Sequence, residues 1–160
     1  MLETYTFPRF AYRRAPEQVS GRPVRHPVVI VGAGPVGLTA ALACARRGLR
    51  AVVLDDNDTV SVGSRALCYA KRPLEVWDRL GVADRLIDQG VQWRIGKVFR
   101  GDGLVYQFDL LPETGHRMPA MINLQQYYLE EYLIDACARD GRVDLLWRHK
   151  VIGLSQHADH

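Results

Sequence analysis

The segment from Pro27 to Gly37, which reads PVVIVGAGPVG, constrains the fold more than any other part of this sequence. Four consecutive β-branched residues, Val28 to Val31, predict a strand. Because no polar residue alternates with them, we expect both faces of this strand to be buried in the centre of a parallel sheet. Three glycines follow at the spacing G-x-G-x-x-G: Gly32, Gly34 and Gly37. This order predicts a strand, a glycine turn and a helix, as in an α/β fold.

Each glycine has its own function in such a unit. Gly32 permits the tight turn out of the strand, Gly34 lets a diphosphate approach the backbone, and Gly37 lets the helix pack closely on the strand. The helix is predicted to run to about Arg47, with four apolar residues on one face: Leu38, Ala41, Leu42 and Ala45. Its first turn can bind an anion through backbone N–H groups and the positive end of the helix dipole. The candidate diphosphate-binding residues are Gly32, Gly34, Pro35, Val36 and Gly37.

An acidic residue ends the second predicted strand. Residues 51–54 read AVVL, and Asp55 follows them. A carboxylate at about this distance after the glycines can accept hydrogen bonds from ribose hydroxyls, and it repels a 2′-phosphate. Asp56 and Asp58 add to this repulsion. The sequence therefore predicts a dinucleotide with an unphosphorylated adenosine ribose, FAD or NAD, in preference to NADP. The alternative is a βαβ unit that binds no ligand.

Composition limits the other classes of function. Apolar residues make up 48% of the chain and charged residues 24%, as in an ordinary globular protein. The net charge of +3 comes from scattered basic residues, and no stretch has the length of a membrane span. With no signal-peptide pattern at Met1, we expect a cytoplasmic protein with no nucleic-acid or membrane partner. The five histidines are dispersed and predict no metal site.

The remaining segments follow an α/β order. Residues 1–26 are predicted to form an extended N-terminal arm on the domain surface, with a flexible tail as the alternative, and residues 27–160 form the domain itself. The elements predicted after Asp58 are helices at 73–80 and 82–88, a hairpin at about 91–110, a helix at about 125–139, and strands at 143–147 and 151–154. This order predicts a partial doubly wound, Rossmann-like sheet of parallel strands, interrupted by an antiparallel hairpin that belongs to a second sheet.

With these elements in place, the sequence resembles the FAD-dependent aromatic hydroxylases, the para-hydroxybenzoate hydroxylase type of flavoprotein monooxygenase. Within this family it is most similar to the branch of 3-(3-hydroxyphenyl)propionate hydroxylase and phenol-type hydroxylases. The resemblance extends from about His26 to Leu154. Three blocks carry it: the glycine turn with Asp55, the segment Gly63-Ser64-Arg65-Ala66 with the helix after it, and the segment Gln126-Tyr-Tyr-Leu129-Glu130.

The resemblance implies bound FAD, NAD(P)H as the reductant, and hydroxylation of a small aromatic substrate with O2. It places Arg65 beside the FAD pyrophosphate, where a guanidinium can bind phosphate bidentately. It places Gln126 on the flavin side of the cofactor, and Ser64 is a further candidate donor to a phosphate. No catalytic residue is identified. The choice between NADH and NADPH stays open, as does assembly into a homo-oligomer.

Members of this family are several times longer than this chain, and a later Asp-Gly block of theirs has no counterpart here. We therefore expect these residues to be an N-terminal portion that holds FAD weakly and is inactive alone. A missing fourth strand would leave one edge of the strand at 28–31 without a partner. Two alternatives remain: another FAD- or NAD-dependent oxidoreductase that shares the first βαβ unit, and a non-catalytic nucleotide-binding module.

Overall fold

The computed structural model describes residues 5–63 and 65–157, which form two compact units. Unit 1 contains residues 5–63 and 130–157, and unit 2 contains residues 65–129. The long helix α5 (Gln126–Asp140) begins in unit 2 and continues in unit 1. Ser64, a candidate phosphate donor, lies outside the described residues. None of the helices in the described part of the chain is both long and apolar enough to cross a membrane.

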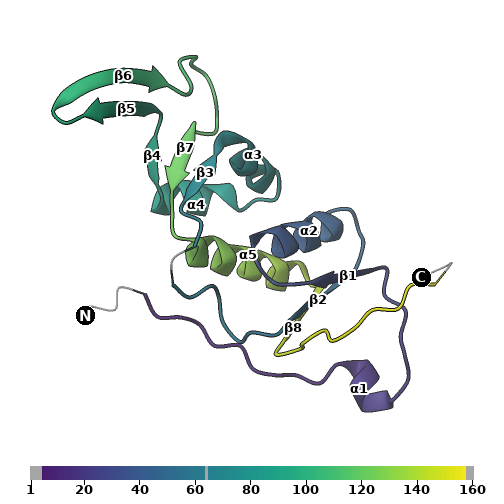
Figure 1. The fold of residues 1–160 in the computed structure, drawn as a ribbon. Coiled ribbons are helices and arrows are strands. Elements are labelled where there is room, and N and C mark those ends of the chain that lie inside the picture. The colour runs from purple at the N-terminus through teal and green to yellow at the C-terminus, as the bar shows by residue number, and fades with distance from the viewer. Residues whose placement is uncertain (1–4, 64, 158–160) are drawn as a thin grey trace. The chain divides into compact units, whose positions relative to one another are not determined.

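Unit 1 is built on a three-stranded parallel sheet with the order β1-β2-β8 (Figure 1). Its strands are β1 (Val28–Val31), β2 (Ala51–Asp55) and β8 (Val143–Trp147). The helix α2 (Pro35–Ala45) connects β1 to β2, and α5 leads into β8. The parallel α/β fold predicted from the sequence is therefore confirmed. Because the strands are parallel, their carboxyl ends meet along one edge, where Val31 pairs with Leu54 and Asp55 with Trp147.

The apolar face of α2 forms much of the core of unit 1. Its four predicted inward residues, Leu38, Ala41, Leu42 and Ala45, are at most 1% exposed. The helix α5 lies beside α2 (Figure 1), and the buried Cys137 thiol donates to the Leu38 carbonyl at 3.7 Å. Leu133 of α5 is also fully buried. These contacts keep α2, and with it the glycine turn that precedes it, in a fixed position on the sheet.

Two strand predictions are wrong. The strand β1 forms an edge of the sheet, as expected from the missing fourth strand, but Val29 and Val31 are 52% and 66% exposed, although both faces were expected to be buried. Only the face that carries Ile30 packs on α2, because side chains alternate along a strand. Residues 151–157 form no strand, and Ile152 and Leu154 are over 90% exposed. In the described residues no neighbouring strand pairs with this segment. Its β-branched side chains alone are not sufficient to form a strand.

An arm segment, residues 5–24, packs against the parallel sheet of unit 1 before β1 begins. Figure 1 shows it passing beneath the strands, with α2 above them. Ala15 of this segment is buried with Val52 and Leu146, which lie on neighbouring strands. The segment contains a short helix, α1 (Pro16–Ser20), that the sequence did not predict. The Gln18 side chain begins this helix by accepting the N–H of Ala15 at 2.9 Å.

Unit 2 combines two helices with two small antiparallel sheets. Its elements are β3 (Cys68–Ala70), α3 (Lys71–Arg79), α4 (Ala83–Gln89), β4 (Val91–Trp93), β5 (Ile95–Arg100), β6 (Gly103–Asp109) and β7 (Met121–Asn123). The strands β5 and β6 form a hairpin in a sheet of its own, so the predicted separate antiparallel hairpin is confirmed. Residues 91–93, expected within this hairpin, instead pair with β7 in a three-stranded sheet of order β3-β7-β4.

Candidate functional site

The glycine turn connects the carboxyl end of β1 to the first turn of α2. Gly32 has a φ of +101°, which L side chains rarely adopt, and its N–H donates to the Leu54 carbonyl of β2 at 2.8 Å. A β-carbon at Gly37 would lie 2.0 Å from the Gly32 carbonyl oxygen, so no side chain fits there. At Gly34, by contrast, no described atom lies within 4 Å of the β-carbon position. The turn is thus tightly packed at Gly37 and open at Gly34.

Backbone donors at the start of α2 point to an anion site. Gly34 is the N-cap, and Pro35 is the first residue of the helix. N–H groups in the first turn of a helix have no intrahelical acceptor, and here these groups belong to Val36 and Gly37, since proline has none. Val36 is 84% exposed. Together with the positive end of the helix dipole, these donors can bind a diphosphate without any charged side chain.

The Asp55 carboxylate reaches the glycine turn. Its Oδ2 accepts the N–H of Ala33 at 2.6 Å, and its Oδ1 accepts the backbone and side-chain N–H groups of Asn57 at 2.8 and 3.0 Å. Asp55 therefore holds the turn against β2, which the sequence did not predict. An ionised carboxylate has about four acceptor positions, so Asp55 can still accept a hydrogen bond from a ribose hydroxyl.

A cavity of about 170 Å³ lies at this edge of the sheet. It is lined by Val31, Gly32, Leu54, Asp55, Asp56, His149, Lys150 and Val151. The sequence predicted the glycine and the acids here but not the last three residues, which begin two positions after the end of β8. The signal that could have found them is the parallel strand order, because it brings the carboxyl ends of distant segments to one edge. The cavity thus combines apolar walls with two carboxylates and two basic side chains.

The other candidate residues belong to unit 2. Gln126 is the first residue of α5, and its Oε1 accepts the N–H of Ala66 at 3.3 Å. Gln126 therefore lies beside the residue that follows Arg65, and Arg65 itself is exposed. Burial, together with the neighbouring Tyr128, raises the pKa of Tyr127. The structure brings the candidates together in two groups, one in each unit.

A buried carboxylate fixes the loop that leads toward Arg65. Glu130 of α5 is 2% exposed, and its two oxygens accept hydrogen bonds from the N–H and the hydroxyl of Ser61, both at 2.6 Å. Gly63, two residues further on, has a φ of +83°. In the sequence, Glu130 is marked only as the last residue of a segment that resembles the family, and its contact with Ser61 is visible in the structure alone.

Replacing Glu130 with alanine is expected to lower the free energy of unfolding by about 2 kcal/mol, because it removes the buried carboxylate that accepts two hydrogen bonds from Ser61. Glu130→Gln is expected to lower it less, since the amide oxygen can still accept one of the two hydrogen bonds. Urea unfolding of the chain measures both values. An alanine variant as stable as the wild type would contradict this function of Glu130.

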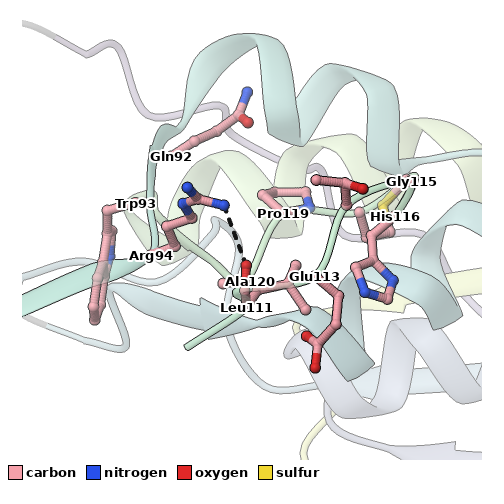
Figure 2. Close-up of a pocket in the computed structure, with 11 residues that line it drawn as sticks. Gln92, Trp93, Arg94, Leu111, Glu113, Gly115, His116, Pro119 and Ala120 are labelled. Carbon is pink, nitrogen blue, oxygen red and sulfur yellow. Dashed lines mark hydrogen bonds between the residues drawn. The ribbon is translucent and has the colours of Figure 1, made fainter. Parts of the chain in front are cut away.

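A larger cavity, of about 360 Å³, lies within unit 2 (Figure 2). Two of the polar side chains that line it, Arg94 and His116, have partners in the protein. Arg94 donates to the Leu111 carbonyl at 3.2 Å, marked by the dashed line in Figure 2, and lies 3.6 Å from Asp109. The Nδ1 of His116 lies 2.9 Å from the Lys71 ammonium group. Although this cavity is the larger of the two, the smaller one holds the glycine turn and the acid, so its chemistry fits a dinucleotide better.

Comparison with known proteins gives a consistent result. The family model described as FAD binding domain matches residues 25–160. The chain is 31% identical over 140 residues to a flavin-dependent monooxygenase of Mycobacteroides abscessus, covering 82% of this chain and 29% of that protein. It is 26% identical over 132 residues to a 3-(3-hydroxy-phenyl)propionate/3-hydroxycinnamic acid hydroxylase of Mycobacterium sp. strain JLS, covering 82% and 23%.

A solved structure agrees with these relatives. The crystal structure of p-nitrophenol 4-monooxygenase PnpA from Pseudomonas putida DLL-E4 matches with a TM-score of 0.74 and 31% identity, over 82% of this chain and 34% of that one. The chain thus spans between 23% and 34% of the length of these three relatives.

Proposed function

Because this chain belongs to the FAD binding domain family of the flavin-dependent monooxygenases, we propose that unit 1 holds the adenosine diphosphate part of FAD. The observation that carries the proposal is the hydrogen bond of 2.6 Å from the Ala33 N–H to Asp55, which joins the glycine turn and the acid in one site. The residues fit the cofactor: Gly34 leaves room at the backbone, α2 offers its first-turn N–H groups, and Asp55 retains acceptor positions for ribose.

Each candidate residue has a stated function in this proposal. The glycine turn and the start of α2 bind the diphosphate through Gly32, Gly34, Pro35, Val36 and Gly37. Asp55 accepts hydrogen bonds from the ribose hydroxyls. The family resemblance assigns Arg65 and Ser64 to the pyrophosphate and Gln126 to the flavin side of the cofactor. These assignments follow the family resemblance of the residues together with their local chemistry.

The proposed activity of the protein that carries this chain is hydroxylation of a small, phenol-type aromatic substrate with NAD(P)H and O2. Bound FAD supplies the oxidation–reduction chemistry, while the residues described above bind and orient its adenosine diphosphate part. The relatives named for p-nitrophenol and for 3-(3-hydroxy-phenyl)propionate support a phenolic substrate class. Use of a soluble nicotinamide reductant fits a cytoplasmic location.

An assay of the protein that carries this chain tests the proposal. Flavin should be visible in the absorbance spectrum of the purified protein, and a phenolic compound such as p-nitrophenol should accelerate NAD(P)H oxidation, with O2 uptake and a hydroxylated product. Bound flavin without NAD(P)H oxidation would favour a non-catalytic module. A bound nicotinamide cofactor in the absence of flavin would favour a dehydrogenase and would contradict the proposal.

A further inference from the structure

The arm segment is attached to the parallel sheet by specific side-chain contacts, although residues 5–24 lie outside the part of the chain that the family model matches. The Phe10 ring stacks on Trp147 at 4.3 Å with an interplanar angle of 13°. Its N–H donates to the Asp58 carbonyl at 2.7 Å, and the neighbouring Arg9 pairs with the Asp58 carboxylate at 2.6 Å. With Ala15 buried on the sheet, these contacts fix the path of the arm segment across the ends of β2 and β8.

The arm segment also surrounds one residue of the 170 Å³ cavity, His149. The Tyr12 ring stacks on the imidazole at 5.0 Å with an interplanar angle of 22°. The Nε2 atom of His149 lies 3.3 Å from the Gln18 side-chain oxygen, which also accepts the Tyr12 hydroxyl at 3.2 Å. The Nδ1 atom lies 2.9 Å from the Trp147 carbonyl. Both oxygens are acceptors, so a neutral imidazole donates to one of them, and the Tyr12 ring lies against its face.

His149 links these contacts to the candidate dinucleotide site. Its backbone N–H donates to the Asp55 carbonyl at 2.7 Å, and the residue lines the cavity together with Gly32 and Asp55. Tyr12 is 46% exposed, so its stacking on His149 adds little to the buried core. The contact thus fixes the orientation of a cavity wall more than it contributes to folding.

We propose that the arm segment is part of the nucleotide site: Tyr12 and Gln18 are positioning residues that hold His149, and His149 contacts the adenosine end of the dinucleotide. This inference rests on the proposed function of unit 1. Tyr12 and Gln18 lie outside the matched family domain. They would nevertheless affect cofactor affinity, because they position His149 in the wall of the cavity beside Asp55.

The test compares three variants of the 160-residue chain: Tyr12→Ala, Tyr12→Phe and Arg14→Ala. Affinity for ADP is measured by calorimetry, and backbone hydrogen exchange at His149 is measured without ligand. Tyr12→Ala removes the stacked ring and is expected to weaken ADP binding about three- to tenfold and to accelerate exchange at His149. Tyr12→Phe keeps the ring and should stay close to the wild type. Arg14 is an exposed residue of the same segment, so Arg14→Ala should change neither value.

The outcomes separate this inference from the function on which it rests. Unchanged affinity and exchange in Tyr12→Ala would overturn it. Faster exchange with unchanged affinity would also overturn it, because the arm segment would then stabilise the end of β8 without affecting nucleotide binding. If the wild-type chain binds no ADP, the proposed function fails and this inference fails with it, a result that is recognised before any variant is made.

Discussion

Gly37→Ala is expected to disrupt the fold of unit 1 and to abolish cofactor binding. The new β-carbon would lie 2.0 Å from the Gly32 carbonyl oxygen and 3.2 Å from the Ile30 side chain. The first of these contacts is with backbone, which cannot rotate away, so α2 would have to move off β1. We expect the free energy of unfolding to fall by about 3 kcal/mol or more. Urea unfolding monitored by circular dichroism measures this loss, and a variant of wild-type stability would contradict the described packing.

Gly34→Ala is the matched control, because it makes the same substitution three residues earlier. No described atom lies within 4 Å of the β-carbon position, and Gly34 has a φ of −78°, which alanine adopts readily. We expect a change in stability below about 1 kcal/mol. Affinity for FAD should nevertheless fall at least about tenfold, since the methyl group would occupy the space where the diphosphate approaches the backbone. Normal affinity in this variant would contradict a diphosphate at the turn.

Asp55→Ala is expected to produce the second large effect, a loss of nucleotide affinity of at least about tenfold. The substitution removes the acceptors proposed for ribose, and it also leaves the buried Ala33 N–H without its partner at 2.6 Å. Both losses act on the site, the first directly and the second through the glycine turn. Fluorescence titration with FAD measures the affinity. Thermal unfolding measures how much the hydrogen bond between Asp55 and the glycine turn contributes to stability.

Two further variants separate these contributions. Asp55→Asn keeps one side-chain oxygen, so it should retain more stability than the alanine variant while losing the negative charge. Asp56→Ala removes a neighbouring carboxylate from the same cavity but leaves the hydrogen bond to Ala33 intact. If Asp56→Ala weakens FAD binding as much as Asp55→Ala does, general charge and not a specific acceptor determines the affinity.

The sequence predicted unit 1 well because its signals are local. The β-branched run, the glycine spacing and the apolar face of α2 each follow from neighbouring residues, and the structure confirms the three parallel strands that they predict. The position of Asp55 at the end of β2 was predicted for the same reason. Its hydrogen bond to Ala33 was not, because that contact depends on how closely two parallel strand ends approach each other.

The sequence was less informative where structure depends on distant partners. The strands β3, β4 and β7 have three residues each, too few to show an alternation of apolar and polar residues. They form because β3 and β4 both pair with β7. The segment 151–154 shows the opposite case, since a strand-like composition forms no strand without a partner. His149 was not identified as a candidate for a similar reason: its contacts with the arm segment and with the end of β2 join residues that are far apart in the sequence.

A binding titration of the wild-type chain tests whether unit 1 binds the adenosine diphosphate part of FAD. ADP and its analogue with a phosphate on the ribose 2′-oxygen are compared under the same conditions by calorimetry. We expect ADP to bind and the 2′-phosphorylated analogue to bind at least about tenfold more weakly, because Asp55 and Asp56 repel the added charge. Equal or tighter binding of the phosphorylated analogue, or no binding of either compound, would contradict the assignment of unit 1 to the adenosine diphosphate part of FAD.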